Sequence, residues 1–172
     1  FLEAVCITGG EPTLNRDLPE FLRQIKNLGY KIKLDTNGAN PEMLEKLKKE
    51  KLADYVAMDF KAPFENYEKI VNAPIDIAKL EKSINLIKTF PDYEFRITIL
   101  PRLASNGGLL KIAGYLKERK ANKKFFLQDF RQGKCLDKSF ENEKPYSEKE
   151  MHDFLKMLKP YFGRIEIRGE TY

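Results

Sequence analysis

The chain has 172 residues, of which 42% are hydrophobic and 33% are charged, a balance typical of a folded globular protein and not of a disordered one. The net charge is +5, but lysines are scattered among glutamates, which favours a solvated basic surface over a nucleic-acid groove. No apolar run approaches the roughly 18 residues of a membrane span, so we expect neither nucleic acid nor a membrane as a partner.

The two cysteines, Cys6 and Cys135, are far apart and belong to no CxxC pair, so the sequence indicates no zinc site. Cys6 lies in an expected core strand, which predicts a buried thiol. Low cysteine content and the lack of a signal peptide favour the cytoplasm. The chain begins with Phe1 and not with Met, so any upstream segment would lie outside this sequence.

The first element expected is a buried strand over the apolar run 4–7. Gly9 and Gly10 end it, and Pro12 cannot donate a ladder hydrogen bond, so Glu11 projects from bare backbone. Such a place suits a ligand with an amine, although a tight turn with an exposed glutamate has the same sequence pattern.

A helix follows, in which Asp17 and Glu20 have capping-box spacing and Gly29 marks the end. Further along, caps and proline breaks delimit the remaining elements. Strands are expected at 31–34, 55–60, 95–100, 125–130 and 164–168, and a long polar loop at 132–146. Helices are expected after the cap residue Asn40, at 67–71 and 77–90, after Ser105, and after the capping box of Ser147 and Glu150.

Strand and helix thus alternate along the whole chain, which predicts an α/β protein with a parallel sheet and right-handed crossovers. The pattern leaves open a doubly wound sheet or part of a TIM-like barrel. No linker or low-complexity segment divides it, so a single domain over residues 1–172 is expected.

Three acidic residues, Glu11, Asp35 and Asp59, follow successive expected strands at equal intervals of 24 residues. Because parallel strands end at one edge of the sheet, these carboxylates should share that edge, where α/β proteins bind ligands. Two cationic residues are expected near the same edge: Lys61 lies two residues beyond Asp59, and Arg96 lies in the strand expected at 95–100. The mixture suits a zwitterion, although acids after strands also serve as helix caps or turn formers.

The motifs around these residues resemble those of the radical S-adenosylmethionine (radical SAM) enzymes. The stretch Ile7-Thr8-Gly9-Gly10-Glu11-Pro12 looks like the GGE motif of that superfamily. Three more stretches follow in the order and spacing of the activases of glycyl radical enzymes, above all the anaerobic ribonucleoside-triphosphate reductase activating proteins: Asp35-Thr36-Asn37-Gly38, Met58-Asp59-Phe60-Lys61 and Phe95-Arg96-Ile97-Thr98.

The resemblance implies a partial (β/α)6 TIM-like barrel that binds S-adenosylmethionine. It places Gly9, Gly10 and Glu11 at the methionyl amine of the cofactor. It places Asp35, Thr36 and Asp59 around a monovalent cation beside the cofactor carboxylate. The remaining cofactor-binding residues that it implies are Asn37, Lys61 and Arg96.

The chemistry implied is reductive cleavage of S-adenosylmethionine by a [4Fe-4S] cluster, followed by hydrogen abstraction from a glycine of a partner glycyl radical enzyme. A reductant such as flavodoxin or ferredoxin would supply the electron. The protein's own task is to position the cofactor, and no catalytic side chain is assigned.

One departure from the family is large, because the CxxxCxxC motif that ligates the cluster is absent from this chain. We expect that the sequence starts after the family's first strand and cluster loop. The fragment by itself is then expected to be inactive and to leave the strand at 4–7 as an exposed edge, with a tendency to associate. The alternatives are a radical SAM enzyme acting on a small molecule, similar to 7-carboxy-7-deazaguanine synthase, or a cluster-free cofactor-binding module.

Overall fold

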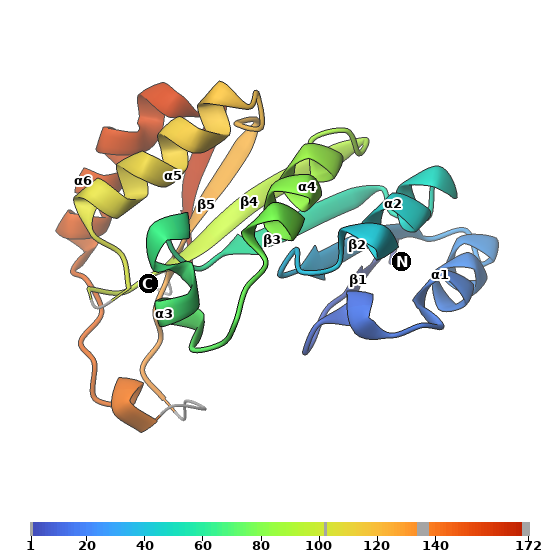
Figure 1. The fold of residues 1–172 in the computed structure, drawn as a ribbon, viewed down its shortest axis with the longest axis horizontal. Helices are drawn as coiled ribbons and strands as arrows, with labels where there is room; N and C mark the ends of the chain where they lie inside the picture. The colour runs from blue at the N-terminus through green and yellow to red at the C-terminus, as the bar shows by residue number, and fades with distance from the viewer. Residues whose placement is uncertain (1, 102, 134–137, 170–172) are drawn as a thin grey trace. The chain divides into compact units, whose positions relative to one another are not determined.

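A computed structural model of the chain describes residues 2–101, 103–133 and 138–169. Its elements alternate along the chain as the pattern predicts (Figure 1). The strands are β1 (Ala4–Ile7), β2 (Lys31–Thr36), β3 (Tyr55–Phe60), β4 (Asp92–Ile99), β5 (Lys124–Asp129) and β6 (Arg164–Arg168). The α-helices are α1 (Leu18–Asn27), α2 (Pro41–Lys49), α3 (Tyr67–Val71), α4 (Ile77–Ile87), α5 (Asn106–Glu118) and α6 (Glu148–Leu158).

The strands form one sheet in the order β1-β2-β3-β4-β5-β6, so consecutive strands are neighbours. The pairs β1–β2, β2–β3 and β5–β6 are parallel. Among the described residues β1 and β6 end this order, and the sheet does not close. The prediction of an α/β protein with a parallel sheet is confirmed, and the open order is that of a partial barrel.

The chain divides into two compact units, of which the first comprises residues 1–59 and 74–95. Here α2 and α4 lie side by side, as Figure 1 shows. Strand residues alternate between two faces, and the apolar set of β2 and β3 is buried against the helices: Ile32, Leu34, Val56 and Met58 are at most 1% exposed. The other face of β2 carries Lys33 and Asp35, so a polar sheet face lies opposite the core.

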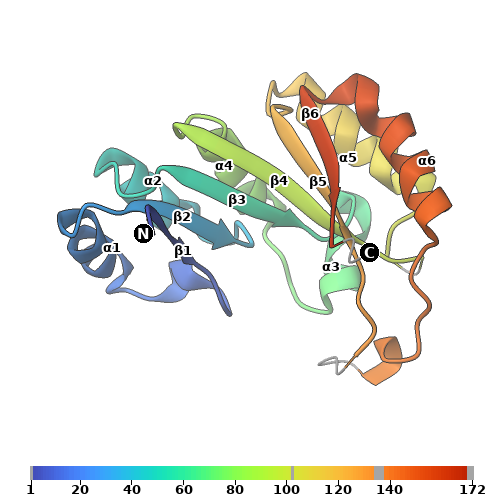
Figure 2. The same cartoon turned by 180° about the vertical axis from the view of Figure 1, so that it is seen from behind.

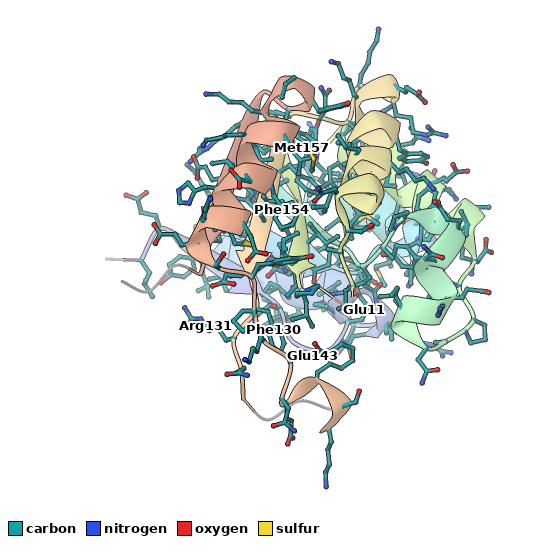
Figure 3. The ribbon with its side chains drawn as sticks, turned by 90° about the vertical axis from the view of Figure 1, so that its left-hand side faces the viewer. Glu11, Phe130, Arg131, Glu143, Phe154 and Met157 are labelled. Atoms are coloured by element: carbon teal, nitrogen blue, oxygen red, sulfur yellow. The ribbon has the colours of Figure 1, made fainter. Side chains whose placement is uncertain are left out.

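The second unit comprises residues 60–73 and 96–172. Figure 2 shows β5 and β6 side by side, and α5 and α6 are in contact. Figure 3 shows that Phe154 and Met157 of α6 point toward α5. Phe125 of β5 stacks on Phe162 with ring centroids 4.6 Å apart, which fixes the end of the last helical segment against the sheet. A single domain over 1–172 remains a prediction.

The strand predicted at 4–7 is present as β1, but the prediction that it is buried is wrong. β1 is exposed at Ala4 and Cys6 and only half-buried at Val5 and Ile7, because it is the terminal strand in the sheet order. The buried thiol predicted for Cys6 is therefore also wrong, since this cysteine is exposed. An exposed β1 edge is what the resemblance to the family predicted, whereas the association of chains through it remains a prediction.

Most boundaries agree with the pattern to within two residues, and three expectations need correction. The helix expected at 77–90 ends at Ile87, and β4 starts at Asp92 and not at Phe95. Asp17 is the N-cap residue of α1, but its side chain makes no capping hydrogen bond. Its backbone has helical angles (φ −85°, ψ −2°), outside the extended region that a capping side chain requires, and Glu20 pairs instead with Arg23.

Two other caps are as predicted. Asn40 accepts a hydrogen bond from the amide of Met43, and Ser147 and Glu150 form a reciprocal capping box on α6. The polar stretch 132–146 contains one short 3-10 turn at Lys138–Phe140, and residues 134–137 lie outside the described part of the chain. None of the described helices combines the length and the apolar character that a membrane span requires.

Candidate cofactor site

The glycine-rich turn after β1 brings the chain from the sheet into a short 3-10 turn, Pro12–Leu14. Gly9 and Gly10 have φ values of +89° and +45°, which L side chains rarely adopt. Glu11 is the N-cap of the 3-10 turn and accepts the amide proton of Thr13 at 3.1 Å. The turn therefore holds the Glu11 carboxylate close to its own backbone and leaves the glycine backbone bare.

The carboxylate of Glu11 also reaches across to the end of β2. Its Oε1 accepts the hydroxyl of Thr13 at 2.5 Å and the hydroxyl of Thr36 at 2.8 Å. Its Oε2 accepts the amide proton of Asn37 at 2.6 Å. Glu11 is thus fixed by four hydrogen bonds, of which the two from Thr36 and Asn37 join the turn after β1 to the end of β2.

The turn after β2 is held just as firmly. The Gly38 amide donates to the hydroxyl of Thr36 at 3.1 Å, and the Gly38 carbonyl accepts the hydroxyl of Ser83 on α4 at 2.6 Å. Gly38 has φ +78°, and a Cβ there would lie 2.8 Å from Sδ of Met58. The backbone angle favours glycine at this position, and a larger residue would also have to displace the end of the Met58 side chain.

Asp35 and Asp59 lie on the polar face of the sheet. Asp35 pairs in register with Ala57, and Asp59 is two residues further on, so their side chains share a face. Asp35 forms an ion pair with Lys33, two residues before it on β2. Thr36 lies on the opposite, buried face, where its hydroxyl is bonded to Glu11 and Gly38.

A cation is predicted at Asp35, Thr36 and Asp59. The two carboxylates lie on one face of the sheet, and the threonine hydroxyl lies on the other. A cation site there would need an oxygen of Thr36 other than its hydroxyl, because the hydroxyl is bonded to Glu11 and Gly38. Among the described residues no group of three or more His, Cys, Asp or Glu side chains is placed to hold a metal ion. That finding does not test a site of two carboxylates and a carbonyl, which stays a prediction.

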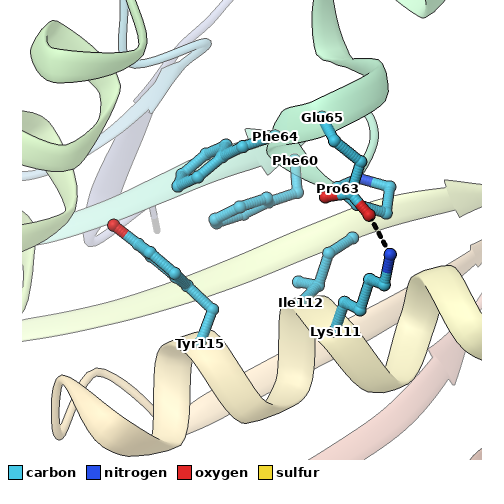
Figure 4. A pocket seen from close by; sticks show the side chains of 7 residues that line it. All are labelled: Phe60, Pro63, Phe64, Glu65, Lys111, Ile112 and Tyr115. Atoms are coloured by element: carbon cyan, nitrogen blue, oxygen red, sulfur yellow. Dashed lines mark hydrogen bonds and ion pairs between the residues drawn. The ribbon is translucent and has the colours of Figure 1, made fainter.

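Lys61 and Arg96 belong to the second unit, directly after β3 and within β4. A role for them beside Glu11 stays a prediction. The same unit has a small pocket between α5 and the segment after β3, lined by Phe60, Pro63, Phe64, Glu65, Lys111, Ile112 and Tyr115 (Figure 4). Its volume of about 70 Å³ is below the range of roughly 300–1,000 Å³ typical of small-molecule sites.

The Glu11 turn offers what an amino-acid group of a cofactor needs. A Cβ at Gly9 or Gly10 would meet no atom within 4 Å, so the space beside this backbone is open to a ligand. The carboxylate oxygen Oε2 of Glu11 accepts one hydrogen bond and has the capacity for a second, which suits an ammonium group. These residues fit the methionyl amine of S-adenosylmethionine.

The described residues do not provide a ligand set for an iron–sulfur cluster. A [4Fe-4S] cluster takes several thiolate ligands, and Cys6 is the one cysteine among the described residues. Cys135 lies outside the described residues. No step through a cluster therefore follows from the residues of this chain.

The structure is that of a parallel α/β protein. Its glycine-rich turn with Glu11 lies at the carboxyl ends of the first strands, where such proteins bind ligands. Residues 1–103 match the Radical SAM superfamily, and the chain belongs to that family. The family uses S-adenosylmethionine and a [4Fe-4S] cluster, in agreement with the expected cofactors.

Two relatives come from Methanocaldococcus jannaschii, and both carry the provisional name of glycyl-radical enzyme activating enzyme. The first is 33% identical over 98% of this chain and 71% of its own length. The second is 32% identical over 67% of this chain and 46% of its own length. A solved domain of the pyruvate-formate lyase-activating enzyme from Bacteroides vulgatus superposes with a TM-score of 0.77 at 20% identity, covering 96% of this chain and 99% of that one.

Sequence reasoning named Thr36 and Asn37 but missed other residues of the network that holds Glu11 in place. Thr13 contributes both its amide and its hydroxyl, and Asn40 donates from its side chain to the Thr13 carbonyl at 2.7 Å. Ser83 lies 45 positions beyond Gly38 and is fully buried. Thr13 stands two residues after a strand-end glutamate, a spacing that suggests a local side-chain bond, whereas no local pattern marks Ser83.

Proposed function

We propose that this protein is a radical SAM activase that generates a glycyl radical on a partner enzyme. The proposal is supported by the family, by two relatives that carry the activase name, and by a turn that fits the cofactor amine. In this family a reduced [4Fe-4S] cluster would supply the electron that cleaves S-adenosylmethionine, and the resulting 5′-deoxyadenosyl radical would take a hydrogen atom from glycine; the described residues of this chain provide no ligand set for that cluster.

The chain's own residues bind and orient the cofactor. Glu11 accepts the methionyl ammonium on Oε2, and Gly9 and Gly10 let that group approach the backbone. Asp59, Lys61 and Arg96 serve the polar groups of the cofactor, and Asn37 fixes the carboxylate that receives the amine. A monovalent cation at Asp35, Thr36 and Asp59 would offset the negative charge that remains on that face beside the Lys33–Asp35 ion pair.

The observation that carries this proposal is the fixed carboxylate of Glu11 beside bare glycine backbone. A preorganised anion at the ends of parallel strands contributes affinity because little conformational freedom is lost on binding. We further propose anaerobic ribonucleotide reductase as the partner, flavodoxin or ferredoxin as the reductant, and the cytoplasm as the location.

The test uses the natural protein, reconstituted anaerobically with iron and sulfide, reduced, and mixed with S-adenosylmethionine and anaerobic ribonucleotide reductase. We expect 5′-deoxyadenosine to form and a glycyl-radical signal to appear in the electron paramagnetic resonance spectrum of the partner. Formation of 5′-deoxyadenosine only with a small molecule would replace the activase by the alternative enzyme. Binding of S-adenosylmethionine without any cleavage would indicate the cofactor-binding module.

Glu11→Gln should weaken S-adenosylmethionine binding by about tenfold or more, because a charge-assisted hydrogen bond to the ammonium is lost. The new amide nitrogen would also face the Asn37 amide, donor against donor. Calorimetry measures the affinity, and Glu42→Gln is the control, since Glu42 is an exposed carboxylate that pairs with Lys82. Equal affinities of the Glu11 variant and the wild type would remove Glu11 from the binding site.

A further inference from the structure

The two oxygens of Glu11 have unequal surroundings. Oε1 accepts three hydrogen bonds, from the amide and hydroxyl of Thr13 and from the hydroxyl of Thr36. Oε2 accepts one, from the amide of Asn37. A carboxylate oxygen accepts about two hydrogen bonds, so Oε1 is saturated by the protein and Oε2 is the oxygen with remaining capacity.

The hydroxyls that saturate Oε1 are buried and are held in place themselves. Thr13 is 0% exposed and Thr36 is 3% exposed. The hydroxyl of Thr36 accepts the Gly38 amide, so its own proton is directed to Glu11. The carbonyl of Thr13 accepts the side-chain amide of Asn40, so the backbone that carries the Thr13 hydroxyl is anchored to the start of α2.

We propose that Thr13 is a positioning residue for amine recognition. Its amide and hydroxyl, together with the Thr36 hydroxyl, hold Oε1 so that Glu11 presents Oε2 in one orientation to the ammonium group of the ligand. The inference rests on the proposed function, because it assigns to Thr13 the orientation of the group that binds the cofactor amine.

The physical effect is preorganisation. A glutamate side chain loses rotational freedom when a ligand immobilises it, and that cost is absent if the protein has already fixed the carboxylate. Removing the Thr13 hydroxyl leaves two of the three hydrogen bonds to Oε1, from the Thr13 amide and the Thr36 hydroxyl, so part of the cost returns on binding. We expect a loss of about three- to tenfold in affinity for a ligand that carries the amine.

The test compares two nucleosides that differ in the amine. S-Adenosylhomocysteine carries the amino-acid group, and 5′-methylthioadenosine has the same nucleoside thioether without it. Calorimetry with the natural protein should show that Thr13→Val weakens S-adenosylhomocysteine binding and leaves 5′-methylthioadenosine binding unchanged. Thr13→Ser, which keeps the hydroxyl, should restore the affinity.

Two variants and one ligand-free measurement keep the outcomes separate. Thr89→Val is the control, because the Thr89 hydroxyl donates to the Leu86 carbonyl and its loss should change neither affinity. In iron-free protein, Thr13→Val should shift the amide proton resonance of Asn37 upfield, since the Asn37 bond to Oε2 loosens once the carboxylate can rotate.

An unchanged affinity for S-adenosylhomocysteine in Thr13→Val would overturn the positioning role, as would an equal loss for both nucleosides. A wild-type protein that binds neither nucleoside would instead count against the proposed function. The Asn37 resonance then decides the positioning role by itself, and an unshifted resonance in Thr13→Val would refute it.

Discussion

At the scale of single residues, two buried hydroxyls of the first unit, those of Thr13 and Thr36, donate hydrogen bonds to the carboxylate of Glu11. Glu11 is bonded by Thr13, Thr36 and Asn37, and these bonds link the turn after β1 to the turn after β2. Ser83 extends the network to α4 through the Gly38 carbonyl. Buried hydroxyls that are fully bonded rigidify a site, so the orientation of Glu11 is built into the core of the first unit.

Gly38→Ala should destabilise the fold by more than the roughly 1–2 kcal/mol that left-handed backbone costs an L residue, because the new Cβ also meets Met58. Gly29→Ala is the matched control, since Gly29 has φ +88° and its Cβ would meet nothing within 4 Å. Urea unfolding gives both free energies. Equal losses for the two variants would show that Met58 yields at no cost.

At the scale of elements, the position of a strand in the sheet order decides its burial. β1 and β2 are both short strands with apolar residues, yet Leu34 of β2 is 0% exposed while Ile7 of β1 is only half-buried. The difference arises because β2 has a neighbour on each side and β1 has one among the described residues. β1 (AVCI) is the more apolar of the two and β2 (KIKLDT) is half polar, so composition alone would predict the opposite burial and the tertiary position makes the difference.

Leu34→Ala should cost about 2–5 kcal/mol of unfolding free energy, the range for a large-to-small change in a core. Ile7→Ala should cost less than Leu34→Ala, because part of the Ile7 side chain is already in water. Urea denaturation of both variants under the same conditions measures the difference. A larger loss for Ile7 would mean that β1 is covered in solution.

The capping box of α6 predicts a pH effect. The hydrogen bond from the Ser147 hydroxyl, followed by that from the Ser147 amide, lowers the pKa of Glu150 below 4.5. A lowered folded pKa contributes stability above the unfolded value, and this contribution is lost as the pH falls through the folded pKa. Ser147→Ala should bring the pKa of Glu150 back up toward 4.5, as NMR titration of both proteins would show.

At the scale of the whole molecule, the family binds a [4Fe-4S] cluster, whereas this chain contains no CxxxCxxC motif. The chain belongs to the radical SAM superfamily, and its first relative extends beyond the matched region, which is 71% of that protein. The residues proposed to bind the amine belong to the first unit, whereas Lys61 and Arg96 belong to the second. Cofactor binding at all of these residues is thus a property to test on the natural protein.

The 172-residue chain alone should acquire no [4Fe-4S] cluster, because it has two cysteines, Cys6 and Cys135, and no CxxxCxxC motif. Anaerobic reconstitution with iron and sulfide should therefore give none of the broad visible absorbance that such clusters show. The control is a Cys6→Ser variant, which should behave identically. A stoichiometric cluster that depends on Cys6 would contradict the prediction.

Local signals along the chain were enough to predict the alternation of strands and helices, the parallel sheet and the family, because hydrophobic periodicity, caps and the motif at 7–12 are all read over short stretches. They also predicted Glu11 as the residue at the end of the first strand. The folded arrangement was needed to establish that β1 is exposed, that the Thr36 hydroxyl reaches Glu11, and that Ser83 belongs to the site network. These properties depend on which residues meet across the sheet, and contacts between residues far apart in the chain have no local signature.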